Sequence, residues 1–129
     1  MILRLLIAFI LTTSAACAHS KDLAMFYTER GLASAESQWE DAYYKVLNDC
    51  KERFAAATPE AQLCFRPVFE VNKLVEAVTE ESVMLLRDYW FQRAQGYDPD
   101  FKQVARKIQR LVSQLPESAR QYFSLVEGL

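Results

Sequence analysis

The sequence predicts an all-α protein, a small helical bundle that follows an N-terminal export signal. Apolar residues recur at three- and four-residue steps along most of the chain, as they do in amphipathic helices. Only three glycines and four prolines interrupt the 129 residues, fewer than the turns of a β-sheet require. The first eighteen residues have the order of a leader peptide. We therefore expect a signal peptide over residues 1–18 and a single helical domain over residues 19–129, long enough for one modest core.

The predicted leader starts with one positive charge. Arg4 precedes an apolar run over residues 5–11, and small residues follow over residues 12–18. This run is much shorter than the ~20 residues that cross a bilayer, which favours a removable signal over a permanent transmembrane helix. We expect the protein to be exported. In a bacterium it would reach the periplasm, free or anchored to a membrane and facing the periplasm; otherwise it would be secreted.

Two cleavage sites overlap at the end of the leader. Ala16, Cys17 and Ala18 form an A-x-A site, which would release a soluble chain that starts at His19. Residues 14–17 also resemble a bacterial lipobox, in which cleavage leaves Cys17 as a lipid-carrying N-terminus. That pattern prefers a large aliphatic residue where this chain has Ser14. We retain both interpretations, with lipidation of Cys17 as the first.

The first long helix is expected from about Asp22 to Ala57, loosened at Gly31, with an acidic outer face. One face carries the apolar positions Leu32, Ala35, Trp39, Tyr43, Val46, Cys50 and Phe54.

Thr58 and Pro59 then form a helix start signal, an N-cap followed by proline at the first helical position. We expect a second long helix that is kinked near Pro67 and ended by Gly96 at the C′ position. Its core-facing positions are Cys64, Val68, Val71, Val75, Val78, Leu85 and Tyr89.

Cys50 and Cys64 are the cysteines that remain after either cleavage. An even number of cysteines in an exported chain predicts a disulfide. Each cysteine lies about seven residues from the break at residues 57–59, so in a helical hairpin the two stand at similar heights, on the order of 10 Å from the turn. The alternative is a pair of buried thiols.

Two short helices are expected to complete the bundle. Asp98 followed by Pro99 repeats the cap-and-proline signature and starts a third helix. One side of this helix carries Phe101, Val104, Ile108 and Leu111. A fourth helix begins near Pro116 and carries Ala119, Tyr122, Phe123 and Val126. The simplest arrangement is an up-and-down four-helix bundle. The alternatives are an irregular helical array and two short helices that pack on one end of the long hairpin.

The sequence contains few of the residues and motifs on which catalytic sites are built. His19 is the only histidine, no Glu-x-x-His motif occurs, and there is no glycine-rich phosphate loop. Histidine-based triads, zinc and haem sites, di-metal carboxylate sites and nucleotide sites therefore have no motif to support them. We expect a protein that is not an enzyme and that holds neither a cofactor nor a metal.

Charge divides the chain into two parts. Residues 22–100 contain eight Lys and Arg against fifteen Asp and Glu, a net charge of −7, whereas residues 101–129 contain five against two, a net charge of +3. Lys102, Arg106 and Arg110 recur at four-residue steps and form a basic ridge. The ridge would contact anionic lipid headgroups or an acidic partner, or else neutralise the acidic helices of the same molecule. Nucleic acid is an unsuitable partner for a chain of net charge −2.

Adjacent aromatic residues indicate a recognition surface. Residues 89–91 are consecutive aromatics that sweep about 200° of a helix, more than one core-facing stripe hides, so at least one of them should face outward or into another helix. Tyr44, next to Tyr43, poses the same problem. Partly exposed Trp and Tyr side chains are typical of interfaces, although cover by the short helices would also explain them.

These observations predict an exported, non-enzymatic bundle that binds another protein, of the inhibitor, immunity, exclusion or assembly-factor type. The partner-binding candidates are Trp90, Tyr44, Phe91, Lys102, Arg106 and Arg110. The alternative is a periplasmic carrier that holds an apolar ligand such as a lipid.

Overall fold

The computed structural model describes the backbone of residues 2–127 and the side chains of residues 20–127. All regular elements in the described chain are helical, which confirms the all-α class. The predicted leader, its cleavage sites and Cys17 lie outside the residues whose side chains are described. The elements are α1 (Ile2–Arg53), α2 (Pro59–Ala94), α3 (Phe101–Ser113), α4 (Glu117–Arg120), the 3₁₀ turn η1 (Gln121–Phe123) and α5 (Ser124–Glu127).

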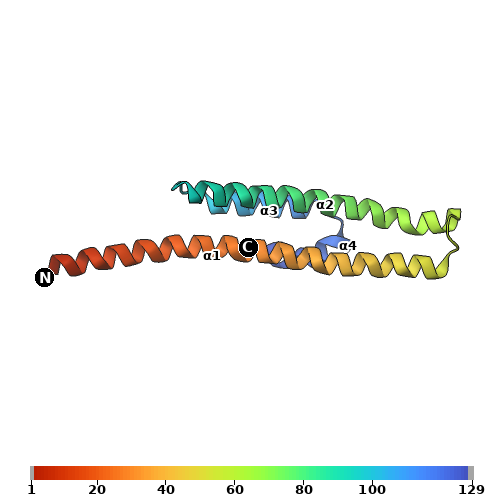
Figure 1. Ribbon diagram of the computed structural model, residues 1–129, viewed down its shortest axis with the longest axis horizontal. Helices are drawn as coiled ribbons and strands as arrows, with labels where there is room; N and C mark the ends of the chain where they lie inside the picture. The colour runs from red at the N-terminus through yellow and green to blue at the C-terminus, as the bar shows by residue number, and fades with distance from the viewer. Residues whose placement is uncertain (1, 128–129) are drawn as a thin grey trace.

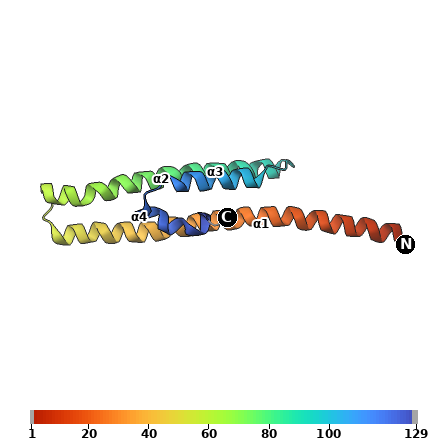
Figure 2. The same ribbon diagram turned by 180° about the vertical axis from the view of Figure 1, so that it is seen from behind.

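Helices α1 and α2 form a long antiparallel hairpin, and the N-terminal part of α1 extends past the end of α2 (Figures 1 and 2). Helix α1 is unbroken at Gly31 and ends at Arg53, four residues before the expected end. In the turn that follows, Ala57 takes a left-handed φ of 61° and Thr58 is extended, so neither continues a helix. As predicted, Thr58 caps α2: its hydroxyl accepts a hydrogen bond from the Ala61 amide at 3.2 Å.

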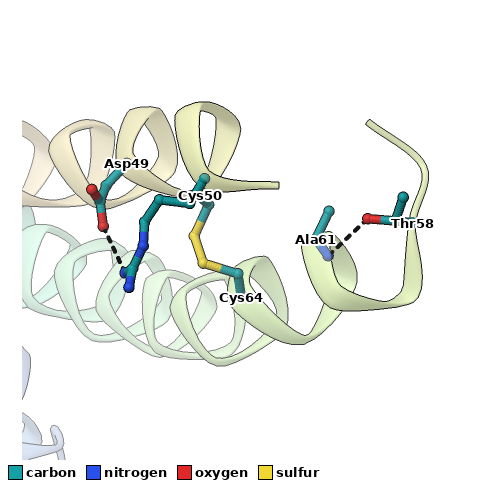
Figure 3. The surroundings of a disulfide bond; sticks show 6 residues. Asp49, Cys50, Thr58, Ala61 and Cys64 are labelled. Atoms are coloured by element: carbon teal, nitrogen blue, oxygen red, sulfur yellow. Dashed lines mark hydrogen bonds and ion pairs between the residues drawn. A yellow bond between two sulfur atoms is a disulfide. The ribbon is translucent and has the colours of Figure 1, made fainter. Parts of the chain in front are cut away.

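Cys50 and Cys64 form a disulfide between the two long helices, as the sequence predicts (Figure 3). Their Cα atoms lie 5.9 Å apart. Pro67 lies within α2 and does not end it.

The short helices cover only one half of this hairpin. Helix α3 packs mainly on α2, and the segment from α4 to α5 packs on α1. Both lie toward the end of the hairpin that is opposite to the disulfide (Figures 1 and 2). The structure is therefore not a bundle of four helices along its whole length. It matches the alternative in which the short helices pack on one end of the long hairpin.

The two ends of the α2–α3 connection are held by local hydrogen bonds. Gly96 is the C′ residue of α2, as predicted, with a φ of 86° and a hydrogen bond from its amide to the Arg93 carbonyl. The predicted cap of α3 at Asp98 is wrong. Asp100 caps the helix, because its carboxylate accepts the Lys102 amide at 3.0 Å, whereas Asp98 faces the Lys21 ammonium at 3.5 Å.

The core lies in the part of the molecule where α1, α2, α3 and the α4–α5 segment all pack together. Most predicted core positions of α1 and α2 lie in or against it, but Val46 is 42 % exposed and does not. Val46 lies beyond the reach of the short helices, so only α2 is available to cover it. Three further residues are nearly inaccessible although the sequence patterns did not indicate them: Met25, Thr28 and Leu86. The buried cluster comprises Met25, Leu32, Ala35, Trp39, Val75, Val78, Leu86, Tyr89, Ile108, Val112, Leu115, Ala119, Phe123 and Val126.

Candidate functional site

The half of the hairpin that carries the disulfide is built from two helices only. The buried cluster ends at Trp39 on α1 and at Val75 on α2. We call the part beyond it, residues 40–53 and 59–74, the disulfide arm. Cys50 and Ala61 are buried there by the hairpin itself, but much of the remaining surface is left uncovered. The arm therefore presents to solvent a face that the short helices cover elsewhere.

A row of aromatic rings runs from the core onto this arm. The indole of Trp39 lies 6.3 Å from the Tyr122 ring in the core and 6.2 Å from Tyr43, measured between ring centroids. From Tyr43 the row continues to Phe69 at 6.4 Å and then to Phe65 at 5.8 Å. Ring pairs at these separations attract one another. The exposed end of the row is thus connected by contacts to the packed interior.

One hydrogen bond locks the base of this row. The Trp39 indole N–H donates to the Asn72 side-chain oxygen at 3.0 Å, and the Asn72 amide donates to Glu76 at 3.0 Å. Burial raises the pKa of Tyr43, and the neighbouring Tyr44 and Glu76 raise it further. The Tyr43 phenol therefore stays neutral at physiological pH, and this part of the arm remains apolar.

The arm carries an open groove of about 690 Å³ along α2. Its apolar wall consists of Tyr43, Leu63, Phe65 and Phe69, and its polar rim includes Arg66, Glu70 and Lys73. Leu63 is 71 % exposed and Phe69 is 44 % exposed. The groove lies on the surface of the hairpin and not in the bundle interior.

The structure separates the predicted partner-binding aromatics. Tyr44 lies on the arm and is 54 % exposed. Because Cys50 and Cys64 are level, Tyr44 stands opposite the middle of the arm's second helix, and Trp90 lies about twenty residues farther along, roughly 30 Å away. Trp90 is half-buried, with its ring edge-on to Tyr89 at 5.1 Å, while Phe91 beside it is exposed. The three aromatics therefore do not form one surface.

The predicted basic ridge lies on α3, away from the arm. Lys102, Arg106 and Arg110 are all exposed. None of them is within 4.0 Å of a carboxylate in the described part of the chain, so direct ion pairing there does not neutralise them.

The apolar groove residues Leu63, Phe65 and Phe69 are not among the partner-binding residues predicted from the sequence. All three lie off the stripe that begins at Cys64, and this was the available signal: apolar side chains outside a helix's core-facing stripe indicate a second apolar face. In the described chain, no cluster of three or more His, Cys, Asp or Glu is placed to hold a metal ion. None of its helices combines the length and apolarity that membrane crossing requires. Comparison with protein-family models, curated proteins and solved structures finds no match to the chain.

Proposed function

We propose that this protein is an exported, non-enzymatic binding protein that docks another protein on its disulfide arm. The observation that carries the proposal is the exposed apolar face beside the groove. Exposed and contiguous apolar surface on a small domain is typical of an interaction site. Aromatic residues that are already fixed in place make effective interface contacts. The exposed members of this face are Leu63 and Phe69, which line the groove, and Tyr44, whose ring lies 5.5 Å from that of the groove residue Tyr43.

The arm is held in a fixed shape before any partner binds. The disulfide joins its two helices near the tip, and the bond from Trp39 to Asn72 joins them at its base. A surface that is ordered beforehand loses less conformational entropy on binding. The arm therefore suits recognition of a partner without a large rearrangement.

The short helices do not extend over the arm, and this indicates which shape of partner fits there. Elsewhere in the molecule the same hairpin is covered by α3 and by the α4–α5 segment, so a helix of the partner would continue that packing along the arm. An amphipathic helix inserts apolar side chains at three- and four-residue steps into such a groove. Arg66 lies at the rim and has no ion-pair partner in the described chain, which favours acidic residues along the partner's edge.

The test is site-specific crosslinking followed by affinity measurement. A photoreactive residue at Leu63 should capture the partner, while one at Leu125, which is equally exposed on α5, should not. With the captured partner purified, Leu63→Ala combined with Phe69→Ala should weaken binding at least tenfold, about 1.4 kcal/mol. Leu125→Ala should leave the affinity unchanged. Capture at Trp90 or Phe91 alone, or unchanged affinity in the arm variant, would contradict the proposal.

The volume of the groove supports a second candidate, a carrier of an apolar ligand. About 690 Å³ lies within the range of small-molecule sites. A fluorescent fatty acid that binds with micromolar affinity, and is lost in the Leu63→Ala and Phe69→Ala variant without any protein partner, would favour the carrier over the protein binder.

A further inference from the structure

A second groove lies at the opposite end of the molecule, between α1 and α3. Helix α5 ends beside Gly31, where Val126 Cγ2 is 3.6 Å from the position that a Cβ atom would take. Between Gly31 and the start of α1, no described residue that follows α5 covers this side of the helix. The open space is about 490 Å³ and is lined mainly by Ala24, Met25, Thr28, Phe101, Lys102 and Arg106.

The floor of this groove is apolar and its edge is cationic. Met25 and Thr28 are each only 1 % exposed, and the Thr28 hydroxyl already donates to the Ala24 carbonyl at 2.9 Å. The floor therefore has no hydroxyl hydrogen to offer a ligand. Lys102 and Arg106 are exposed at its edge. This combination suits a molecule with an anionic head and an apolar body.

The charge extends beyond the groove along α3. The helix contains four cationic side chains and no Asp or Glu over its thirteen residues. Lys102, Arg106, Lys107 and Arg110 are all exposed, and none has a carboxylate within ion-pair distance in the described chain. Several unpaired cations close to one groove produce a local positive potential that attracts anions.

Exposed apolar residues lie at this same end of the bundle. Leu23, Phe26 and Tyr27 belong to the same stretch of α1 as the groove, and Phe91 and Tyr97 flank the end of α2. None of these five residues lines the groove itself, but aromatic residues at the same end of a protein as several cations are typical of a membrane–water interface. An acidic protein partner would use the cations but not the apolar floor at Met25, so an anionic lipid explains both features of the groove.

We propose that this groove and the basic face of α3 bind anionic phospholipid, with the phosphate at Lys102 and Arg106 and the upper part of an acyl chain against Met25. The position agrees with the expected N-terminus, since the groove begins five residues after His19 and seven after Cys17. A tether at Cys17 would hold this end, and not the disulfide arm, at the bilayer. The proposal uses the export expected from the sequence but does not depend on the arm as a docking site.

The test uses the exported full chain with Cys17→Ser, which removes any lipid anchor. We expect it to sediment with phosphatidylcholine vesicles that contain phosphatidylglycerol, to bind pure phosphatidylcholine vesicles far less, and to be released by high salt. A basic residue near such a surface contributes about fivefold in affinity, so Lys102→Gln with Arg106→Gln should weaken binding about 25-fold. The control, Lys45→Gln with Lys51→Gln, makes the same charge change on the arm and should bind like the parent chain.

Three outcomes would overturn the proposal. Equal binding to both vesicle types, or an equal loss in the control variant, would show that the α3 groove does not select anionic lipid. Unchanged vesicle binding in the Lys102→Gln and Arg106→Gln variant, together with lost binding of a polyglutamate peptide, would assign the cations to an acidic protein instead. Crosslinking at Leu63 is measured without vesicles, so failure of this proposal is distinguishable from failure of the arm.

Discussion

Arg93 holds Asp22 through two hydrogen bonds, from Nε at 2.9 Å and from Nη2 at 3.1 Å, although 71 residues separate them in the sequence. The Tyr89 hydroxyl donates to the same carboxylate at 3.0 Å. Bidentate pairs of this kind are stronger and more directional than ordinary hydrogen bonds. They fasten the start of the expected mature chain to the last turns of α2.

Replacing Asp22 should change the titration of Tyr89. Burial, the hydrogen bond to Asp22 and the charge of Asp22 raise the pKa of Tyr89 from 10.0 to about 12. In Asp22→Asn the charge is lost but the burial remains, so we expect a pKa that falls and still exceeds 10. An NMR titration of ring-labelled tyrosine, with Tyr89→Phe to assign the signal, measures it. An unchanged Tyr89 pKa in Asp22→Asn would show that the carboxylate does not govern it.

The same contact predicts a loss of stability at alkaline pH. The folded chain keeps Tyr89 protonated up to about pH 12, whereas the unfolded chain loses this proton near pH 10. The contribution of Tyr89 is therefore fully present below pH 10 and declines as the pH rises from 10 to 12. Denaturant unfolding across this interval should show a steeper decline for the parent chain than for Tyr89→Phe. Parallel curves would contradict the assignment.

The disulfide should contribute about 3 kcal/mol to the free energy of unfolding, the value expected for a loop of this length. The loop is short, with fourteen residues of separation, but the arm has no third helix to hold its tip. We expect Cys50→Ser with Cys64→Ser to lower the midpoint of denaturant unfolding and to speed amide exchange most in residues 42–72. A reductant should have the same effect on the parent chain and none on the double variant. A change of less than about 1 kcal/mol would mean that the arm is held mainly by its other contacts.

Two core hydroxyls should be dispensable. The side-chain oxygens of Thr79 and Ser82 are buried and have no hydrogen-bond partner in the described chain. A buried polar group without a partner is unfavourable, so Thr79→Val and Ser82→Ala should each raise the free energy of unfolding by about 1 kcal/mol. Thr28→Val is the matched comparison, because that hydroxyl is satisfied by the Ala24 carbonyl, and it should give no gain. Destabilisation by both core variants would indicate that the hydroxyls are bonded in solution.

The cap of α3 gives a direct comparison of two neighbouring acids. Asp100 accepts the amides of Lys102 and Gln103, so Asp100→Ala should cost about 1 kcal/mol. Asp98 forms only long contacts, at 3.5 Å to Lys21 and 3.7 Å to Arg93. Exposed pairs of this kind contribute little, so Asp98→Ala should have a smaller effect. Thermal unfolding of the two variants decides between them, and the reverse order would restore Asp98 as the cap.

Local signals in the sequence predicted the features that depend on a few neighbouring residues. Thr58 and Gly96 were assigned to the positions that they occupy, since a cap is formed by groups within one turn. The pairing of Cys50 with Cys64 followed from their equal distance to that turn. Asp98 was assigned wrongly because the sequence offers two acids on either side of Pro99, and only the path of the chain past Lys21 decides which of them meets the α3 amides.

The candidate site depended on information that no single segment contains. Val46 occupies a helix position of the kind that α1 buries at Leu32 and Trp39, and its exposure follows from where α3 and α5 stop. The separation of Tyr44 from Trp90 likewise follows from the antiparallel pairing of two long helices. Neither relationship is visible in the periodicity of one helix.

By itself, the sequence determined the helical class, the turn at Thr58, the disulfide and the unbalanced charge between the long helices and α3. The tertiary structure decided that the short helices cover only one half of the hairpin, which leaves an aromatic arm at one end and a cationic groove at the other. The two kinds of feature differ in how far apart along the chain the interacting residues lie. Capping and periodicity act over about four residues, whereas exposure depends on side-chain packing between segments as far apart as Trp39 and Tyr122.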